Sequence, residues 1–163
     1  MSTMIIGTPD RLEAVAELAQ QECWDCERLE DGDLELFVSI QGGMLQVRVT
    51  DLANFDALHF AFVLASLSIP KRRHYRVRRM LGSINECLWI GHFDLDPSGN
   101  QIIYRHAILL AGQDAVKESC EAVVAFGRRS YERYLTPFVL VAGGACKIED
   151  ALKSATFDTD GNA

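Results

Sequence analysis

The stretch "LELFVSIQGGMLQVRVT", from Leu34 to Thr50, decides the fold class of this chain. Leucine, valine or isoleucine occupies every second position on both sides of Gly42-Gly43. A period of two is typical of β-strands with one buried face. Because Gln41-Gly42-Gly43 favours a tight turn, the stretch predicts an antiparallel hairpin.

Further strand signals lie on both sides of this hairpin. Trp24 to Leu29 predicts a weak strand before it, and Asp51 to Asp56 is polar enough for a loop after it. From Leu58 to Leu67, large residues alternate with smaller ones, although a helix is a competing interpretation. Aromatic and branched residues at period two favour a strand there.

Helix signals flank the strands. Thr8-Pro9-Asp10 predicts a helix start, and the apolar spacing continues to about Glu22. A second helix is predicted to begin at Pro70. A third begins near Asp114 or Ala115 and continues to about Leu135, and a short fourth helix spans Ile148 to Ala155. Pro137 should break or kink the third helix, with a turn or two beyond it. This order predicts one mainly antiparallel α+β domain over residues 1–156, followed by a loose tail over 157–163.

The segment "GHFDLDPSGNQIIYRHAILL", from Gly91 to Leu110, resembles a calcium loop but predicts a second hairpin. An EF-hand needs a glutamate at loop position 12, where this chain has Arg105. Pro97 and Gly99 instead favour a short turn between two strands. If Asp96 pairs with Asn100, His92 faces Tyr104 and His106 lies diagonal to His92. A one-residue slip would reverse every face.

"SINECLWIGHFDLDPSGNQIIYRHAILL", from Ser83 to Leu110, resembles the central motif of the bacterial YbjN family. The segments "YERYLTPFVLVAGG" and "EDALKSA" also resemble the end of that family. The resemblance implies a type III secretion chaperone-like α+β fold, in the order α-βββ-α-ββ-α, and a role in sensory transduction or stress regulation. It implies no catalytic residues. The matching residues are Asn85, Glu86, Gly91, His92, Phe93, Arg105 and His106.

These motif residues allow a structural and a chemical interpretation. Arg105 could reach a carboxylate such as Glu86 across the hairpin. His92 and His106, with Asp94 nearby, could instead serve a small hydrolase or a metal-dependent enzyme. The sequence contains no complete catalytic or metal motif, so we expect no catalysis, no metal and no cofactor.

Composition limits the other functions. The chain has 163 residues and a net charge of −7, which argues against general nucleic-acid binding. No apolar run is long enough for a membrane helix, and no export signal is evident. The five cysteines suggest free thiols in a bacterial cytoplasm. Cys23 and Cys26 form a CxxC pair, but it follows a helix, where the dipole does not favour a reactive thiolate.

One basic stretch stands out, "KRRHYRVRR" from Lys71 to Arg79, which holds six of the sixteen Lys and Arg residues. A solvated helix face is the simplest interpretation. Arg72, Arg76 and Arg79 could also dock an acidic protein partner, and a nucleic-acid-binding regulator is a further alternative. An acidic patch within the chain could provide such a partner surface: Asp25, Glu27, Glu30, Asp31, Asp33 and Glu35.

The expected strand at Leu58 has no charge on either face. Ala61, Val63 and Ala65 lie on the side away from Leu58 and Phe60, where a water-facing strand usually carries polar residues. Either a helix of the same chain or a second copy should cover that side. We therefore expect a protein-interaction module that forms a homodimer through Ala61, Val63 and Ala65.

Overall fold

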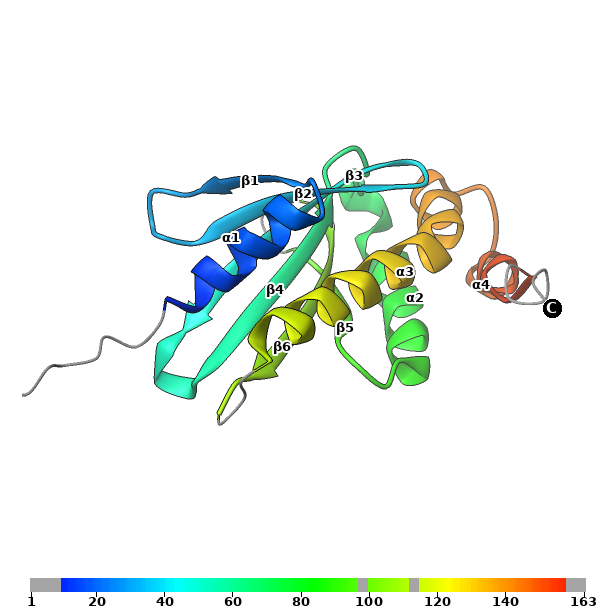
Figure 1. The fold of residues 1–163 in the computed structure, drawn as a ribbon. Helices are drawn as coiled ribbons and strands as arrows, with labels where there is room; N and C mark the ends of the chain where they lie inside the picture. Colours follow the sequence, from blue (N-terminus) through cyan, green and yellow to red (C-terminus); the bar gives the residue numbers. More distant parts are fainter. Residues whose placement is uncertain (1–9, 97–99, 112–114, 158–163) are drawn as a thin grey trace, which may run out of the picture.

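The computed structural model describes residues 10–96, 100–111 and 115–157. Three of its α-helices contact a single sheet, and the last packs on the helix before it (Figure 1). The α-helices are α1 (Arg11–Gln21), α2 (His74–Cys87), α3 (Val116–Gly143) and α4 (Ile148–Phe157). Short 3-10 turns are η1 (Ala53–Phe55) and η2 (Lys71–Arg73). The strands are β1 (Asp25–Arg28), β2 (Leu34–Ile40), β3 (Gly43–Leu52), β4 (Ala57–Leu64), β5 (His92–Leu95) and β6 (Ile102–Leu109).

The six strands form one antiparallel sheet in the order β1-β2-β3-β4-β6-β5. The predicted hairpin is confirmed, because Ile40 pairs with Gly43 and Leu34 with Val49. The segment that begins at Leu58 is a strand and not a helix. The predicted α+β class is therefore confirmed, with α2 inserted between the strands of the sheet in sequence.

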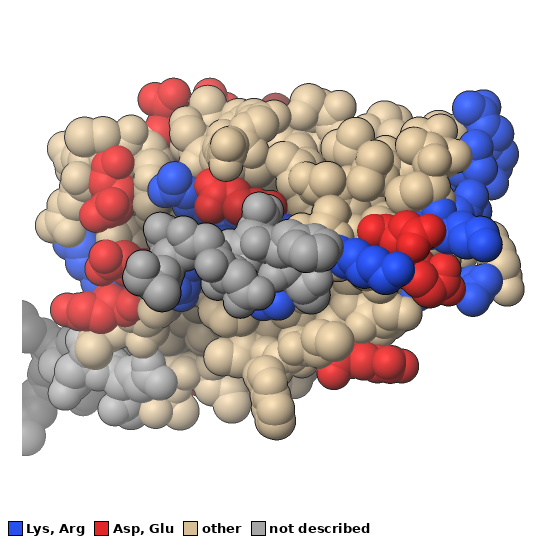
Figure 2. Space-filling view, turned by 90° about the vertical axis from the view of Figure 1, so that its right-hand side faces the viewer, with Lys and Arg blue, Asp and Glu red and all other residues tan. Residues whose placement is uncertain are grey.

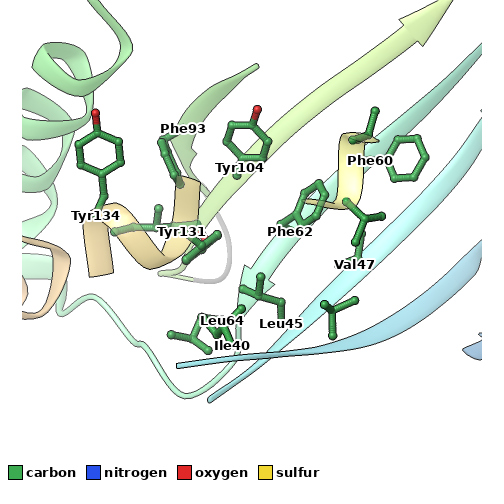
Figure 3. Close-up of a cluster of buried hydrophobic side chains, with 14 of the residues drawn as sticks. Ile40, Leu45, Val47, Phe60, Phe62, Leu64, Phe93, Tyr104, Tyr131 and Tyr134 are labelled. Atoms are coloured by element: carbon green, nitrogen blue, oxygen red, sulfur yellow. The ribbon is translucent and has the colours of Figure 1, made fainter. Parts of the chain in front are cut away.

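One face of the sheet carries the hydrophobic core, and α1 and α3 lie across it (Figure 1). Burial alternates along β2 and β4, as the period of two requires. Figure 3 shows Phe62, Phe93, Tyr104 and Tyr131 gathered between the sheet and α3. The ring centroids of Phe93 and Tyr104 are 5.1 Å apart, a distance typical of interacting aromatic pairs.

The third helix differs from the prediction, because α3 continues through Pro137 to Gly143. Beyond the proline, Phe138 and Val141 are completely buried in the core. Burial of such side chains contributes about 2–3 kcal/mol each, which is comparable to the roughly 3 kcal/mol cost of a proline inside a helix. The packing of this last part of α3 therefore explains why the helix does not end at Leu135.

The predicted register of the second hairpin is wrong by one residue. Phe93 pairs with Tyr104 and His92 with Arg105, and the backbone N–H of Asp96 donates to the carbonyl of Gln101 at 2.8 Å. The reversal puts His92 and His106 on opposite faces of the sheet. The expected turn at Pro97 and Gly99 lies outside the described residues.

The ends of the domain are described in part. Asp10 caps α1 by accepting a hydrogen bond from the N–H of Leu12 at 3.1 Å, as its place before the helix predicts. Thr8 and Pro9 lie outside the described residues, as do residues 158–163 of the expected tail. Phe157, the first residue of that expected tail, is instead the last residue of α4. The last predicted helix is present as α4.

Candidate functional site

The second face of the sheet is the first candidate site. Among the described elements, α1 and α3 pack on the core face, and α2 meets the sheet chiefly at β5 (Figure 1). No described helix crosses the other side, which we call the open face. Its central part consists of Phe37, Ala61 and Val63, which are half-buried, and Ile103, which is buried. Val63 pairs with Ile103, and Gln46 of β3 lies between Phe37 and Val63.

One row of side chains on the open face carries charges of opposite sign at its two ends. The pairing aligns one row of side chains across the sheet: Glu27, Glu35, Arg48, Ala61, Arg105 and His92. Arg48 is already neutralised, since its guanidinium contacts Asp31 and bonds to Asp33 at 2.6 Å. No ion pair involving Glu27, Glu35 or Arg105 is formed within the described part of the chain. In this row the β1–β2 half carries two carboxylates and the β6–β5 half carries Arg105 and His92, while Asp94, paired with Ile103, adds a carboxylate to the β6–β5 half in the neighbouring row.

The residues expected to form a dimer face are placed as follows. Ala61 and Val63 lie on the open face and are half-buried, and Ala65 is exposed just beyond the end of β4. The sequence suggested that either a helix of the same chain or a second copy covers this side. No helix among the described elements covers it. The face is therefore accessible to a partner.

Part of the central motif has a structural role. The side-chain amide of Asn85 donates to the carbonyl of Phe93 and accepts from its N–H, both at 2.8 Å, and so closes the outer edge of β5. Gly91 has φ +66, and a Cβ there would overlap the hydroxyl oxygen of Tyr104. That hydroxyl donates to the carbonyl of Ile90 at 3.0 Å, which holds the segment before β5 against the sheet.

The remaining motif residues line a cavity of about 350 Å³ at the edge of β6. His92, Arg105 and His106 contribute to it, together with His59 from β4 and Trp89 from the segment before β5. Glu86 is exposed and forms no ion pair with Arg105, so the contact suggested by the sequence is not present. The predictions did not include His59 and Trp89, because residues far apart in sequence meet there only through the β4–β6 pairing.

Two histidines of this cavity, His59 and His106, favour their neutral forms. Burial lowers the pKa of His59, and the positive charges of Arg105 and His92 lower it further, while Asp33 opposes the shift. Burial also lowers the pKa of His106, whose ring packs edge-on against Phe126 at 6.4 Å. The Nδ1 atom of His106 is buried without a hydrogen-bond partner among the described residues.

The hydrolase and metal alternatives for His92 and His106 gain no geometric support. Within residues 10–96, 100–111 and 115–157, no three His, Cys, Asp or Glu side chains are grouped closely enough to hold a metal ion. The Arg105 guanidinium lies in the same cavity, and its charge repels a cation. Asp94 uses a carboxylate oxygen to accept from the N–H of Leu95.

The basic stretch is divided between the interior and the surface. Arg76 donates to the carbonyl of Cys146 at 2.6 Å, and the guanidinium of Arg73 lies against Gly144 at the end of α3. Arg72 and Arg79 are exposed. Figure 2, which views the molecule from the side of α4, shows Lys and Arg gathered along one edge with Asp and Glu beside them. The expected acidic partner patch contacts Arg48, not this stretch.

The cysteines are unpaired in the structure. Cys23 is exposed and Cys26 half-buried, and burial raises the pKa of Cys26. A raised pKa leaves less thiolate at neutral pH, which disfavours a reactive CxxC pair. None of the described helices combines the length and apolar character needed to cross a membrane.

Comparisons with known proteins agree with this fold. The model of the YbjN family, described as "Putative bacterial sensory transduction regulator", matches residues 11–139. ExsC in the ExsC–ExsE complex is similar in structure, with TM-score 0.53 and 19% identity, covering 74% of this chain and 90% of that chain. YbjN from E. coli, titled "a putative transcription regulator", has TM-score 0.54 and 8% identity, covering 88% and 95%. No curated protein matches the chain.

Proposed function

The chain belongs to the YbjN family, and from this premise we propose that it acts by binding protein chains through the open face. The observation that carries the proposal is the apolar centre of that face, where no described helix covers Phe37, Ala61 and Val63. Apolar sheet faces in soluble domains are normally covered by another layer. A protein partner would provide that layer.

The partner that the face fits best is a second copy of this chain. A two-fold axis parallel to the strands and midway across the sheet would place β2 of one copy over β6 of the other. Glu35 would then face Arg105 and Glu27 would face His92, while in the neighbouring row Asp25 would face Asp94, a pair of like charges. The first two contacts occur twice in a two-fold dimer, so each contributes twice to its stability. Two aligned sheets of this kind pack about 10 Å apart.

The proposed role is regulatory and not catalytic, in a bacterial cytoplasm. The family description supports regulation in bacteria, and the free cysteines are compatible with a reducing compartment. The ExsC–ExsE complex supports a protein partner, because a protein of this fold is found there bound to another chain. Nucleic-acid binding by α2 is less well supported, since Arg73 and Arg76 contact the end of α3 and its following turn.

Val63→Asp tests the proposal, because it places a carboxylate in the apolar centre of the open face. We expect light scattering to show a dimer for the wild type at high micromolar concentration and a single chain for the variant. Circular dichroism should show that the variant keeps its secondary structure. Ala122→Asp, on an exposed position of α3, introduces the same charge on the helical side and should remain dimeric. A wild type that stays monomeric would overturn the proposed homodimer.

A further inference from the structure

We propose that the cavity beside Trp89 binds a small phosphate monoester, whose phosphate contacts Arg105 and whose flat apolar group stacks on Trp89. Neither the proposed regulatory role nor the family description assigns a ligand to this cavity. The proposal does not require self-association, because every residue that lines the cavity comes from one chain.

The cavity exists because two paired strands differ in length. β5 begins at His92 opposite Arg105, while β6 continues to Leu109. Beyond Arg105, no described strand pairs with that edge of β6, and the segment from Trp89 to Gly91 forms the opposite wall. The resulting volume, about 350 Å³, lies within the roughly 300–1,000 Å³ of small-molecule pockets.

The lining selects an anion. Arg105 is half-buried and has no ion pair or hydrogen bond within the described part of the chain, in contrast to Arg48 on the same row. Its donors match the oxygens of phosphate in geometry and charge. His59 and His92 reach the same cavity, and no carboxylate is among its lining residues. Arg105 is therefore the one charged group among the lining residues, in a chain whose net charge is −7.

Trp89 indicates what carries the phosphate. It is 98% exposed although it belongs to the wall of the cavity. An indole held in water beside an anion-binding group offers a flat face for stacking. Ile90, which is 47% exposed, extends the same apolar surface. An aromatic phosphate ester should therefore bind more tightly than inorganic phosphate.

Titration of Trp89 fluorescence with phenyl phosphate tests the site directly. The chain has two tryptophans, so Trp24→Phe leaves Trp89 as the single reporter. We expect a saturable change in emission as the indole leaves water. Arg105→Gln should weaken binding by roughly tenfold or more, because a charged hydrogen bond contributes about 1.5–3 kcal/mol. Arg72→Gln, an exposed arginine outside the cavity, should leave binding unchanged.

Two further ligands identify the chemistry. Inorganic phosphate should bind, but more weakly than phenyl phosphate, and benzoate should bind more weakly still. Equal binding of benzoate and phenyl phosphate would overturn the assignment to phosphate. The absence of any saturable change with phenyl phosphate would overturn the site itself.

Proton uptake gives a second readout that a merely structural effect would not produce. The charges of Arg105 and His92 contribute to the low pKa of His59, with Asp33 opposing them. A bound phosphate dianion would offset both cations and raise that pKa, so binding near pH 6.5 should take up protons. Calorimetry in two buffers with different ionisation heats measures this uptake, and His59→Gln should reduce it. Uptake that is absent in the wild type would contradict contact between phosphate and His59.

Two controls separate this proposal from the homodimer. Glu35 of a second copy would compete for Arg105, so titrations use protein concentrations at which light scattering shows a single chain. If Arg105→Gln fails to fold, His92→Gln, at an exposed position of β5, replaces it and should still weaken binding. Binding by a chain that never dimerises would overturn the homodimer and leave the phosphate site intact.

Discussion

The two faces of the sheet use the same strands in different ways. Along β4, Phe60 and Phe62 are completely buried on the core face, whereas Ala61 and Val63, which alternate with them, are only half-buried. The core face is filled by large side chains of the same molecule. The open face combines small apolar residues with charges of both signs, which is the composition of a contact surface more than of a solvated one.

Replacing phenylalanine on each face should give the largest difference. Phe62→Ala leaves a cavity against Tyr104 and α3, and we expect the free energy of unfolding to fall by about 3–5 kcal/mol. Phe37→Ala, on the open face, should lower the free energy of unfolding by only about 1 kcal/mol. Urea denaturation of both variants measures the contrast.

The same pair of variants should separate stability from assembly. Phe37→Ala is expected to weaken self-association, because its ring lies beside the apolar centre of the open face. Equal losses of stability for Phe62→Ala and Phe37→Ala would show that the open face is covered within one chain.

Asn85→Ala tests whether the edge of β5 is closed to partners. Loss of the amide leaves the N–H and carbonyl of Phe93 without their partner, which should reduce the free energy of unfolding by about 1–3 kcal/mol. Ser83→Ala, an exposed change in the same helix, provides the matched control and should be nearly neutral. Hydrogen exchange should be faster at Phe93 in Asn85→Ala, and unchanged exchange there would contradict the capping role.

Two helix glycines provide the smallest contrast. A Cβ on Gly127 would lie 2.5 Å from the Phe62 ring, so Gly127→Ala should destabilise by about 1–2 kcal/mol despite a better helix propensity. Nothing lies within 4 Å of a Cβ on Gly82, so Gly82→Ala should stabilise by up to about 1 kcal/mol. Thermal unfolding measures both. Stabilisation by Gly127→Ala would show that α3 packs less closely on the sheet than the structure indicates.

The strands could be predicted because alternation is a local property. Leu34 to Thr50 and the strand at Leu58 carry that pattern within a few residues, and the β2–β3 register follows from the turn at Gly42. The register of the second hairpin could not be derived in the same way. The expected pairing of Asp96 with Asn100 puts Phe93 opposite Ile103, whereas Asp96 bonds to Gln101 in the structure and Phe93 therefore pairs with Tyr104. The continuation of α3 past Pro137 depends on tertiary packing, which no local rule contains.

The candidate sites were predictable to different extents. Ala61 and Val63 could be identified as an unusual surface because apolar residues occupied the outward positions of a strand. The cavity could not be predicted from the sequence, although three of its lining residues, Arg105, His92 and His106, were named as candidates. Its other lining residues, His59 and Trp89, come from β4 and from the segment before β5. The available signal was the "LWIG" segment from Leu88 to Gly91, in which a large aromatic residue lies two positions before a glycine.

A charge exchange between Glu35 and Arg105 tests the central claim, that a second copy binds the open face, most directly. Glu35→Arg and Arg105→Glu each place like charges opposite each other in the proposed dimer. Each variant alone should therefore sediment as a single chain. In an equimolar mixture, the arginine introduced at position 35 of one copy would meet the glutamate introduced at position 105 of the other. The native contact between Glu35 and Arg105 would remain at the second, symmetry-related position.

Sedimentation equilibrium on the two variants and on their mixture is the measurement. The proposed arrangement predicts monomers for each variant alone and a heterodimer for the mixture, with affinity close to that of the wild type. Circular dichroism confirms beforehand that both variants are folded. A mixture that remains monomeric, while the wild type dimerises, would contradict the placement of β2 over β6 across the two-fold axis.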